Sequence, residues 1–483
     1  MDCINPLTGV VFKNIPETDV KDIPTIVSQS KLAQKTWANR SIKERVVYLK
    51  KLIRIFIDEQ DQICKRVAED TGKSEYEALI GEYVLSLGNL KFIAKHATSA
   101  LKPERIRHKI FKNKKSYIQY DPLGVVAVIT PWNYPLILSI VPIISALIAG
   151  NSVVFKPSEH TSATGELLDD LIKKAGFPNE LLQTVYGAGE IGAAVVNEPI
   201  NKINFTGSLK TGKILGKIAA EKMIPIGLEL GGKDPFIVLS DADLDRAAAC
   251  AIWASNFNGG QTCAACERVI VVKDVADVFI TKLKQELDKL SFAPEREVAP
   301  LNNQQQYNIV TSQLEDAKHH AKEVYSKPLP EGLEGLYNVA PSLVIEPNEN
   351  ASIYANETFG PLLTIEIASD ETEAIMLANK LDFGLTASLW TKSTKKAKYL
   401  SKKIEAGSVY INDHLAPQSP AEAPWGGIKS SGIGVTRSIA GLREMCHMKH
   451  VSYERIGLKR DLYWFPYSQK KHRFFTKIIR FLA

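Results

Sequence analysis

The sequence predicts an α/β fold: two doubly wound parallel-sheet lobes joined to a small bridging β-hairpin. Short apolar runs alternate with helical segments over residues 121–243 and again over residues 247–434, which is the pattern of βαβ units. A chain of 483 residues suggests about three units at roughly 150 residues each. Apolar residues make up 45% and charged residues 24%, so disorder, collagen and a disulfide-stapled mini-protein are excluded.

Charge, cysteine content and hydropathy narrow the class of protein that this sequence can encode. The net charge of +6 is small, and we take it to be spread along the chain. It therefore does not indicate a protein that binds nucleic acid. Six cysteines are too sparse for a secreted disulfide framework and indicate reduced thiols in the cytoplasm. Residues 1–20 lack the pattern of a secretory signal. The most apolar stretch, residues 134–150, is short and holds two prolines, so it predicts a buried helix rather than a membrane span.

The elements follow in order along the chain. Residues 24–100 read as helices, because apolar residues recur at three- and four-residue spacing in 25–38 and 43–69. Residues 105–119 alternate basic and apolar side chains, as an exposed hairpin does. Strands are expected at 124–129, 152–155, 182–185, 202–205, 236–239, 269–272, 362–367, 387–390 and 409–411.

Cys263 is the first candidate for chemistry. It ends the sequence NGGQTC, where glycines allow close backbone approach and a following helical stretch would favour its thiolate. The alternative is a small buried apolar side chain. Cys263 and Cys266 also match C-x-x-C, so a redox dithiol or half of a zinc site has to be considered, although no second such pair exists.

Glu229 is the second candidate. It stands in LELGGKDP, where apolar and glycine neighbours would desolvate the carboxyl group and raise its pKa toward that of a general base. The alternative is a strand-end glutamate paired with Lys233.

Two segments are candidates for a phosphate-binding loop. Residues 187–192 match G-x-G-x-x-G but lack an acidic residue about 20 positions on. Residues 205–212 end a strand with a glycine-rich turn before a basic helix, and are preferred. Two prolines in residues 131–135 force a stiff connection that could aim an amide at a reacting oxygen or be simply a turn.

Taken together, these segments resemble the NAD(P)-dependent aldehyde dehydrogenase superfamily over about residues 5–451. Eight of the family's landmarks appear in its order, and the spacing from Glu229 to Cys263 is similar to the family's. The landmarks are PWNYP (131–135), KPSE (156–159), FTGS (205–208), ELGGK (229–233), GQTC (260–263), ETFGP (357–361), IND (411–413) and PWGGIKSSG (424–432).

The resemblance implies three catalytic roles. Cys263 would attack an aldehyde to form a thiohemiacetal and, after hydride transfer, a thioester. The Asn133 amide and the Cys263 backbone N–H would hold the oxyanion, and Glu229 would activate the hydrolytic water. No metal is implied.

It also implies a cofactor site for NAD, with NADP accepted by some enzymes of this kind. Lys156 and Glu159 would bind the adenosine ribose, and the glutamate would repel a 2′-phosphate. The other cofactor contacts implied are Trp132, Gly207, Ser208, Gly212, Glu357 and Phe359.

Domains and partners are implied in the same way. Residues 1–103 and 123–231 would bind NAD and residues 232–434 would form the catalytic domain. Residues 104–122 and 445–456 would extend a partner's sheet in a homodimer or homotetramer. After residue 432 the family's Gly-x-Gly-Arg-Glu is replaced by a sequence ending in Arg437, a departure expected to affect local packing and not chemistry.

The tail, residues 459–483, runs past the matching segments. Residues 470–483 carry five Lys and Arg and no acid, and their apolar residues fall mainly on one helical face. This predicts either a helix packed on protein or a peripheral membrane contact.

Three other functions are compatible with the sequence. A CoA-acylating dehydrogenase would resolve the thioester with CoA instead of water. A non-catalytic binding or structural protein could use the same scaffold, and a disulfide oxidoreductase could act through Cys263 and Cys266. None of the motifs identifies the aldehyde.

Overall fold

The computed structural model describes residues 1–108, 113–292, 297–333, 336–457 and 459–482. Two compact units make up the chain. The first holds residues 1–101 and 122–447, and the second holds residues 102–121 and 448–483.

A six-stranded sheet lies in the first half of the larger unit, in the order β17-β9-β8-β5-β6-β7. Its strands are parallel except for β17, which pairs antiparallel with β9. The bounds are β5 Val125–Ile129, β6 Ser152–Lys156, β7 Leu182–Thr184, β8 Lys202–Thr206, β9 Ile226–Glu229 and β17 Gly432–Ile433.

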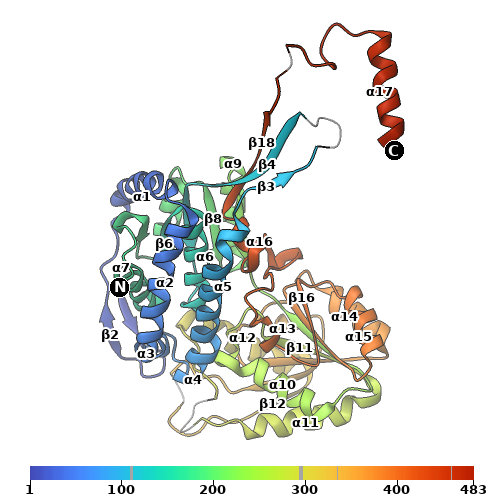
Figure 1. Ribbon diagram of the computed structural model, residues 1–483. Helices are drawn as coiled ribbons and strands as arrows, with labels where there is room; N and C mark the ends of the chain where they lie inside the picture. The colour runs from blue at the N-terminus through green and yellow to red at the C-terminus, as the bar shows by residue number, and fades with distance from the viewer. Residues whose placement is uncertain (109–112, 293–296, 334–335, 458, 483) are drawn as a thin grey trace. The chain divides into compact units, whose positions relative to one another are not determined.

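Helices cover both faces of this sheet, as in other parallel sheets (Figure 1). Val125, Ala127 and Ile129 of β5 pack in one core with residues of α1, α8 and α9. α6 contacts β5 and β6 and is buried along its whole length, as predicted for residues 134–150. The helices of this half are α1 Ile23–Ala38, α2 Ile42–Asp58, α3 Gln60–Thr71, α4 Glu75–Ala78, α5 Val84–Ala100, α6 Ile137–Ala149, α7 Ser162–Lys174, α8 Gly189–Asn197 and α9 Leu209–Lys222.

A seven-stranded sheet forms the second lobe, in the order β12-β13-β14-β11-β10-β15-β16, with only β12 antiparallel to its neighbour. Its strands are β10 Asp234–Val238, β11 Cys266–Val272, β12 Ala321–Ser326, β13 Ser342–Pro347, β14 Leu362–Ala368, β15 Thr386–Trp390 and β16 Ser408–Ile411. The helices are α10 Leu244–Asn256, α11 Ala276–Lys289, α12 Gln304–His320, α13 Ser352–Ala355, α14 Glu371–Lys380, α15 Thr394–Leu400 and α16 Ser438–Arg443. Two parallel-sheet lobes are therefore confirmed.

The smaller unit contains a three-stranded sheet, β18-β4-β3, and the C-terminal helix α17 (Gln469–Leu482). β3 spans Glu104–Ile106, β4 Lys114–Pro122 and β18 Cys446–Glu454, so the expected hairpin and late strand are present on the described residues. Residues 109–112 of the predicted hairpin lie outside the described residues.

Several sequence predictions need correction. The helical stretch predicted over 43–69 is present and divides at Glu59 into α2 and α3. The run 236–239, grouped with the first lobe, belongs to β10 of the second sheet. The sequence analysis also missed β9, β12, β13 and a small N-terminal hairpin of β1 (Asp2–Ile4) and β2 (Val11–Asn14). β1, β2 and β9 have only three or four residues, and polar residues interrupt β12.

Candidate active site

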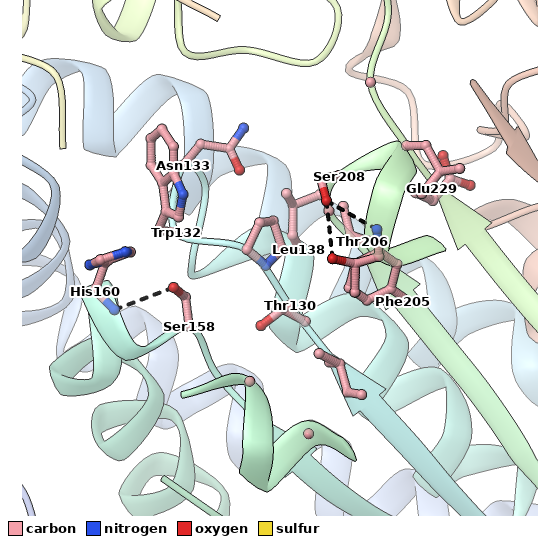
Figure 2. Close-up of a pocket in the computed structure, with 18 of the residues that line it drawn as sticks. Thr130, Trp132, Asn133, Leu138, Ser158, His160, Phe205, Thr206, Ser208 and Glu229 are labelled. Atoms are coloured by element: carbon pink, nitrogen blue, oxygen red, sulfur yellow. Dashed lines mark hydrogen bonds between the residues drawn. The ribbon is translucent and has the colours of Figure 1, made fainter. Parts of the chain in front are cut away.

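A cavity of about 680 Å³ opens at the carboxyl ends of the first sheet's parallel strands. Figure 2 shows Trp132 and Asn133 from the connection after β5, and Ser208 and Glu229 from the β8 and β9 side. Ten of the eleven predicted site residues line it: Trp132, Asn133, Lys156, Glu159, Gly207, Ser208, Glu229, Cys263, Glu357 and Phe359.

Cys263 reaches the cavity because of the irregular backbone that precedes it. Asn258 and Gly259 both adopt left-handed conformations, with φ of 56° and 63°, after α10 ends. Gly232 packs against the resulting loop, and a Cβ atom there would stand only 2.7 Å from the carbonyl oxygen of Cys263. The glycine-rich ELGGK segment is therefore needed for the close approach of the cysteine loop.

The thiol of Cys263 is in an unfavourable setting for ionisation. Burial first, and then the charges of Asp234, Glu229 and Glu357, raise its pKa to about 12, while Arg437 acts in the opposite direction. The helix expected after Cys263, and the favouring of the thiolate that it would bring, are therefore wrong. In place of a helix N-terminus, a turn leads from Cys263 into β11, and no helix dipole is available to stabilise the anion.

Asn133 is fixed from several directions. Its side-chain amide donates to the backbone oxygen of Gln261, 3.0 Å away, two residues before Cys263. Its own backbone oxygen accepts from Lys73 Nζ at 2.8 Å and from the Asn258 side chain at 3.0 Å. The buried Oδ1 atom has no hydrogen-bond partner among the described residues. The amide is thus tied to the cysteine loop before any substrate binds.

Lys73 belongs to a fully buried ion pair that sequence reasoning missed. Its Nζ lies 2.7 Å from Oε1 of Glu82, and both side chains are fully buried. The other carboxylate oxygen of Glu82 accepts from the backbone N–H of Leu136 at 2.8 Å. The ammonium also lies 4.1 Å from the centroid of the Tyr134 ring. The pair therefore holds the second half of the PWNYP segment and the residue that follows it, and no motif marks either member of the pair.

Glu229 ends β9 and is buried, and its Oε2 atom has no hydrogen-bond partner among the described residues. Burial raises its pKa to about 8, against the lowering effects of Arg437 and of a hydrogen bond from Trp425. Lys233 does not pair with it, because its ammonium is bound to Glu267 at 2.9 Å. The raised pKa agrees with the desolvation predicted for this carboxyl group, and its role as a general base stays a prediction.

Arg437 is the main charged residue that the sequence reasoning undervalued. Its guanidinium lies 5.1 Å from the centroid of the Trp425 ring and donates to the backbone oxygen of Gln418 at 2.9 Å. Burial lowers its pKa, and the negative charges of Cys263 and Glu229 oppose that effect. A positive charge therefore acts on both candidate catalytic groups, and the expectation that this departure leaves the chemistry unaffected stays a prediction. A lone arginine among uncharged residues in VTRSIAG was the available signal.

Glu357 lies against the same glycine pair. Gly232 donates its backbone N–H to Oε1 of Glu357 at 3.1 Å, and a Cβ atom on Gly231 would overlap that carboxylate. Burial is the main cause that raises the pKa of Glu357 to about 8. The following residues are fixed by Glu267, whose carboxylate accepts from the backbone N–H of Phe359 at 2.8 Å. The ring of Phe359 meets Trp132 edge to face at 5.5 Å between centroids.

The far part of the cavity suits a nucleotide. Lys156 Nζ lies 3.0 Å from Oε2 of Glu159, and this lysine offsets the effect of burial so that the pKa of Glu159 is lowered. Ser208 caps the N-terminus of α9 by accepting from the backbone N–H of Thr211 at 3.3 Å. A helix N-terminus suits a phosphate, and a carboxylate suits ribose hydroxyl groups.

Two further predictions concern this region. Gly212 is buried in α9 against Leu230 and does not line the cavity, so a direct contact with a ligand has no support. Of the competing glycine loop, Gly189 and Gly192 line the cavity from α8. His160 also lines the cavity, although it was not predicted (Figure 2). Burial lowers the pKa of its imidazole.

The cysteines carry no sign of metal or redox pairing. Cys263 and Cys266 are both free thiols, and Cys266 is buried at the start of β11. Among the described residues, no group of three or more His, Cys, Asp or Glu side chains could hold a metal ion.

Comparisons with known proteins agree with this geometry. The model of the Aldehyde dehydrogenase family matches residues 1–451. A 4,4'-diapolycopene aldehyde oxidase from Methylomonas sp is 35% identical over 99% of this chain and 90% of its own length. Aminoaldehyde dehydrogenase 1 of Pisum sativum is 34% identical over 93% and 91%.

Solved structures give the same answer. Betaine aldehyde dehydrogenase from Staphylococcus aureus, in complex with NAD+, superposes with a TM-score of 0.90 and 29% identity, over 97% of this chain and 94% of that one. An E. coli NADP dependent enzyme superposes with a TM-score of 0.88 and 29% identity over 94% of each chain. Both the fold and the sequence show that this chain belongs to the aldehyde dehydrogenase family.

Proposed function

We propose that this enzyme oxidises an aldehyde to a carboxylic acid with NAD, through a covalent thioester on Cys263. The observation that carries the proposal is that Cys263, Glu229 and Asn133 line one cavity with groups suited to a dinucleotide. Each has the chemistry that its role requires: a nucleophile, a desolvated base and an amide donor.

In the first step Cys263 gives up its thiol proton to water and its Sγ atom attacks the aldehyde carbon, giving a thiohemiacetal; the raised pKa of the thiol makes this deprotonation costly. The developing oxyanion would be stabilised by the side-chain amide of Asn133 and the backbone N–H of Cys263. Because the Asn133 amide is already fixed on the backbone of Gln261, little reorganisation is needed as charge develops.

Bound NAD would accept the hydride that leaves this carbon. Glu229 would then take a proton from water as that water attacks the thioester, which frees the carboxylic acid and the Cys263 thiolate. The unpartnered, buried Oε2 atom of Glu229 supports this role, because nothing else in the described structure occupies it. Hydrolysis by Glu229 also favours a free acid over acyl-CoA as the product.

The cofactor would be held along the cavity from Lys156 and Glu159 to Glu357 and Phe359. The carboxylate of Glu159 supports NAD over NADP, because a 2′-phosphate beside it would place like charges together. Ser208, Gly207 and the N-terminus of α9 would take the pyrophosphate.

The charge of Arg437 supports a substrate without a positive charge. Aminoaldehydes and betaine aldehyde are cationic, and a guanidinium that acts on Cys263 and Glu229 would disfavour a second cation there. Arg437 does not itself line the cavity, so its charge would act from behind the lining residues, and on that basis we propose an uncharged or anionic aldehyde.

Assembly and compartment complete the proposal. β18 and β3 are the edge strands of the small sheet, and an edge strand can extend the sheet of a second copy in a homodimer or homotetramer. All six cysteines are free, which fits a reducing compartment. No helix within the described residues has the length and apolar character needed to cross a bilayer.

A substrate screen tests the proposal. Purified full-length enzyme is supplied with short, aromatic, long-chain, semialdehyde and betaine aldehyde substrates, each with NAD and NADP. NADH and free acid should form in equal amounts with the uncharged or anionic substrates. Product formation only in the presence of CoA, or no oxidation of any aldehyde, would overturn it.

A further inference from the structure

The net positive charge of the chain is concentrated in its last 25 residues. Residues 459–483 carry seven Lys and Arg and one Asp, a formal charge of +6, which is the net charge of the whole protein. The other 458 residues are therefore formally neutral. The excess of basic residues is thus confined to the tail. The assumption from the sequence analysis that it is spread along the chain is wrong.

The single acid of this tail is already neutralised. Asp461 is buried, lies 3.9 Å from Lys114 Nζ of β4, and accepts a hydrogen bond from the Tyr463 hydroxyl at 2.7 Å. These contacts anchor the start of the tail to the small sheet. Because no acidic residue follows Asp461 in the sequence, the charged residues of the rest of the tail are all basic.

α17 separates its charged and apolar side chains. At 100° per residue, Arg473, Lys477 and Arg480 fall on one side and the apolar residues on the other. Part of the apolar side lies open to solvent: the exposed fraction is 48% for Phe474, 60% for Ile479 and 89% for Phe481, whereas Phe475 and Ile478 are half-buried.

Lys471 is the one basic residue that falls on the apolar side, and its position is explained by its contacts. Its ammonium donates to the backbone oxygens of Trp464 and Pro466, each at 2.9 Å. It thus folds the preceding aromatic segment onto the start of the helix. That segment exposes Trp464, Phe465 and Tyr467, by 51%, 73% and 72%.

We infer that residues 462–482 form a docking element for the surface of a membrane that contains anionic lipids. Basic residues opposite an apolar face match a charged headgroup layer above a hydrocarbon layer, and aromatic side chains favour the boundary between them. A helix of 14 residues is too short to span a bilayer, so it would lie in the plane of the surface. The Methylomonas relative aligns over 99% of this chain, so that match extends into the tail.

Vesicle sedimentation tests the inference, with the full-length protein and no substrate or cofactor. The protein should sediment with vesicles of phosphatidylcholine mixed with phosphatidylglycerol, weakly with phosphatidylcholine alone, and less as salt is raised. The triple variant Arg473→Gln/Lys477→Gln/Arg480→Gln should bind the mixed vesicles about a hundredfold more weakly, at about fivefold per charge. The matched control, Lys395→Gln/Lys398→Gln/Lys402→Gln, removes three exposed lysines elsewhere and should bind as the wild type does.

The apolar side is tested by Phe474→Ser/Ile479→Ser/Phe481→Ser, which should lose at least about tenfold in vesicle binding per side chain. The control Met223→Ser changes a methionine that is 90% exposed in the larger unit, and should have no effect. Oxidation of a water-soluble aldehyde should be equal in all these variants, so failure of docking and failure of the proposed reaction are separate results.

Three outcomes would overturn the inference. One is a wild-type protein that does not sediment with the mixed vesicles. Another is equal binding by the charge-depleted variant and its matched control. If the apolar variant instead lowers the mass measured by light scattering without lipid, the face is covered by a second copy of the chain, and the membrane assignment is wrong.

Discussion

Lys73 donates a hydrogen bond to the backbone oxygen of Asn133 across 2.8 Å, although 60 residues separate them in the chain. The same ammonium is paired with Glu82, and the pair is fully buried. A residue remote from every motif therefore helps to fix the amide proposed to hold the oxyanion.

Lys73→Met should destabilise the protein by about 3–5 kcal/mol, because it leaves the Glu82 carboxylate buried without its counter-ion. Urea unfolding measures the loss. The double variant Lys73→Met/Glu82→Gln removes both charges and should recover part of it. A single variant as stable as the wild type would show that the pair contributes nothing.

Cys263→Ala should reduce aldehyde oxidation by at least about 10³-fold, since no thiohemiacetal can form. Steady-state NADH production measures the effect, with thermal unfolding to confirm the fold. Cys266→Ser is the matched control and should keep wild-type rates. If instead Cys266→Ser abolishes activity, a dithiol mechanism replaces the one proposed.

Glu229 should impose an ascending limb on the pH dependence of thioester hydrolysis. Its pKa is raised to about 8 by burial, so below that pH the carboxyl group is protonated and cannot accept a proton from water. The hydrolysis rate should thus fall about tenfold per pH unit below 8 and level off above it. Rapid-quench measurement of acyl-enzyme decay follows this step, and Glu229→Gln should be slow and flat across the same range. A wild-type profile that is also flat would count against Glu229 as the base.

Glu159→Gln should raise the NADP to NAD ratio of kcat/KM by about tenfold or more, because the like-charge repulsion is removed. Both cofactors are compared with one aldehyde. Glu190→Gln, which removes a carboxylate from the exposed side of α8, is the control. An unchanged ratio in Glu159→Gln would mean that this side chain does not select the cofactor.

Arg437→Met should shift selectivity toward cationic aldehydes by about tenfold, because the unfavourable charge is gone while the packing on Trp425 is largely kept. The ratio of kcat/KM for betaine aldehyde to that for an uncharged aldehyde measures it. Arg437→Lys keeps the charge and should retain the wild-type ratio. If Met and Lys variants behave alike, shape and not charge is responsible.

The regular elements were largely predictable from local patterns. The strands at 125–129 and 152–156 are centred on continuous apolar runs, and 266–272 ends in one, because both faces of a parallel sheet are covered by helices. The break between α2 and α3 at Glu59 was not visible, because the apolar spacing continues through it. None of the residues of β12 is buried, so this strand lacks the apolar run that marks the buried strands.

The residues of the candidate site were predictable only in part, namely those that belong to a recognisable motif. Motif resemblance marked Cys263, Glu229 and Asn133, and all three line the cavity. Lys73, Glu82 and Arg437 were not marked, because each acts through contacts with residues far away in the chain.

The sequence by itself determined the family, the two-lobed α/β architecture and the side chains proposed to carry the chemistry, because these are recorded in local composition and in the order of short motifs. Only the tertiary structure decided what surrounds those side chains: the burial that raises the pKa of Glu229, the ion pair beneath Asn133 and the guanidinium near Cys263. Desolvation and charge interactions depend on distances through space, and spacing along the chain does not specify those distances.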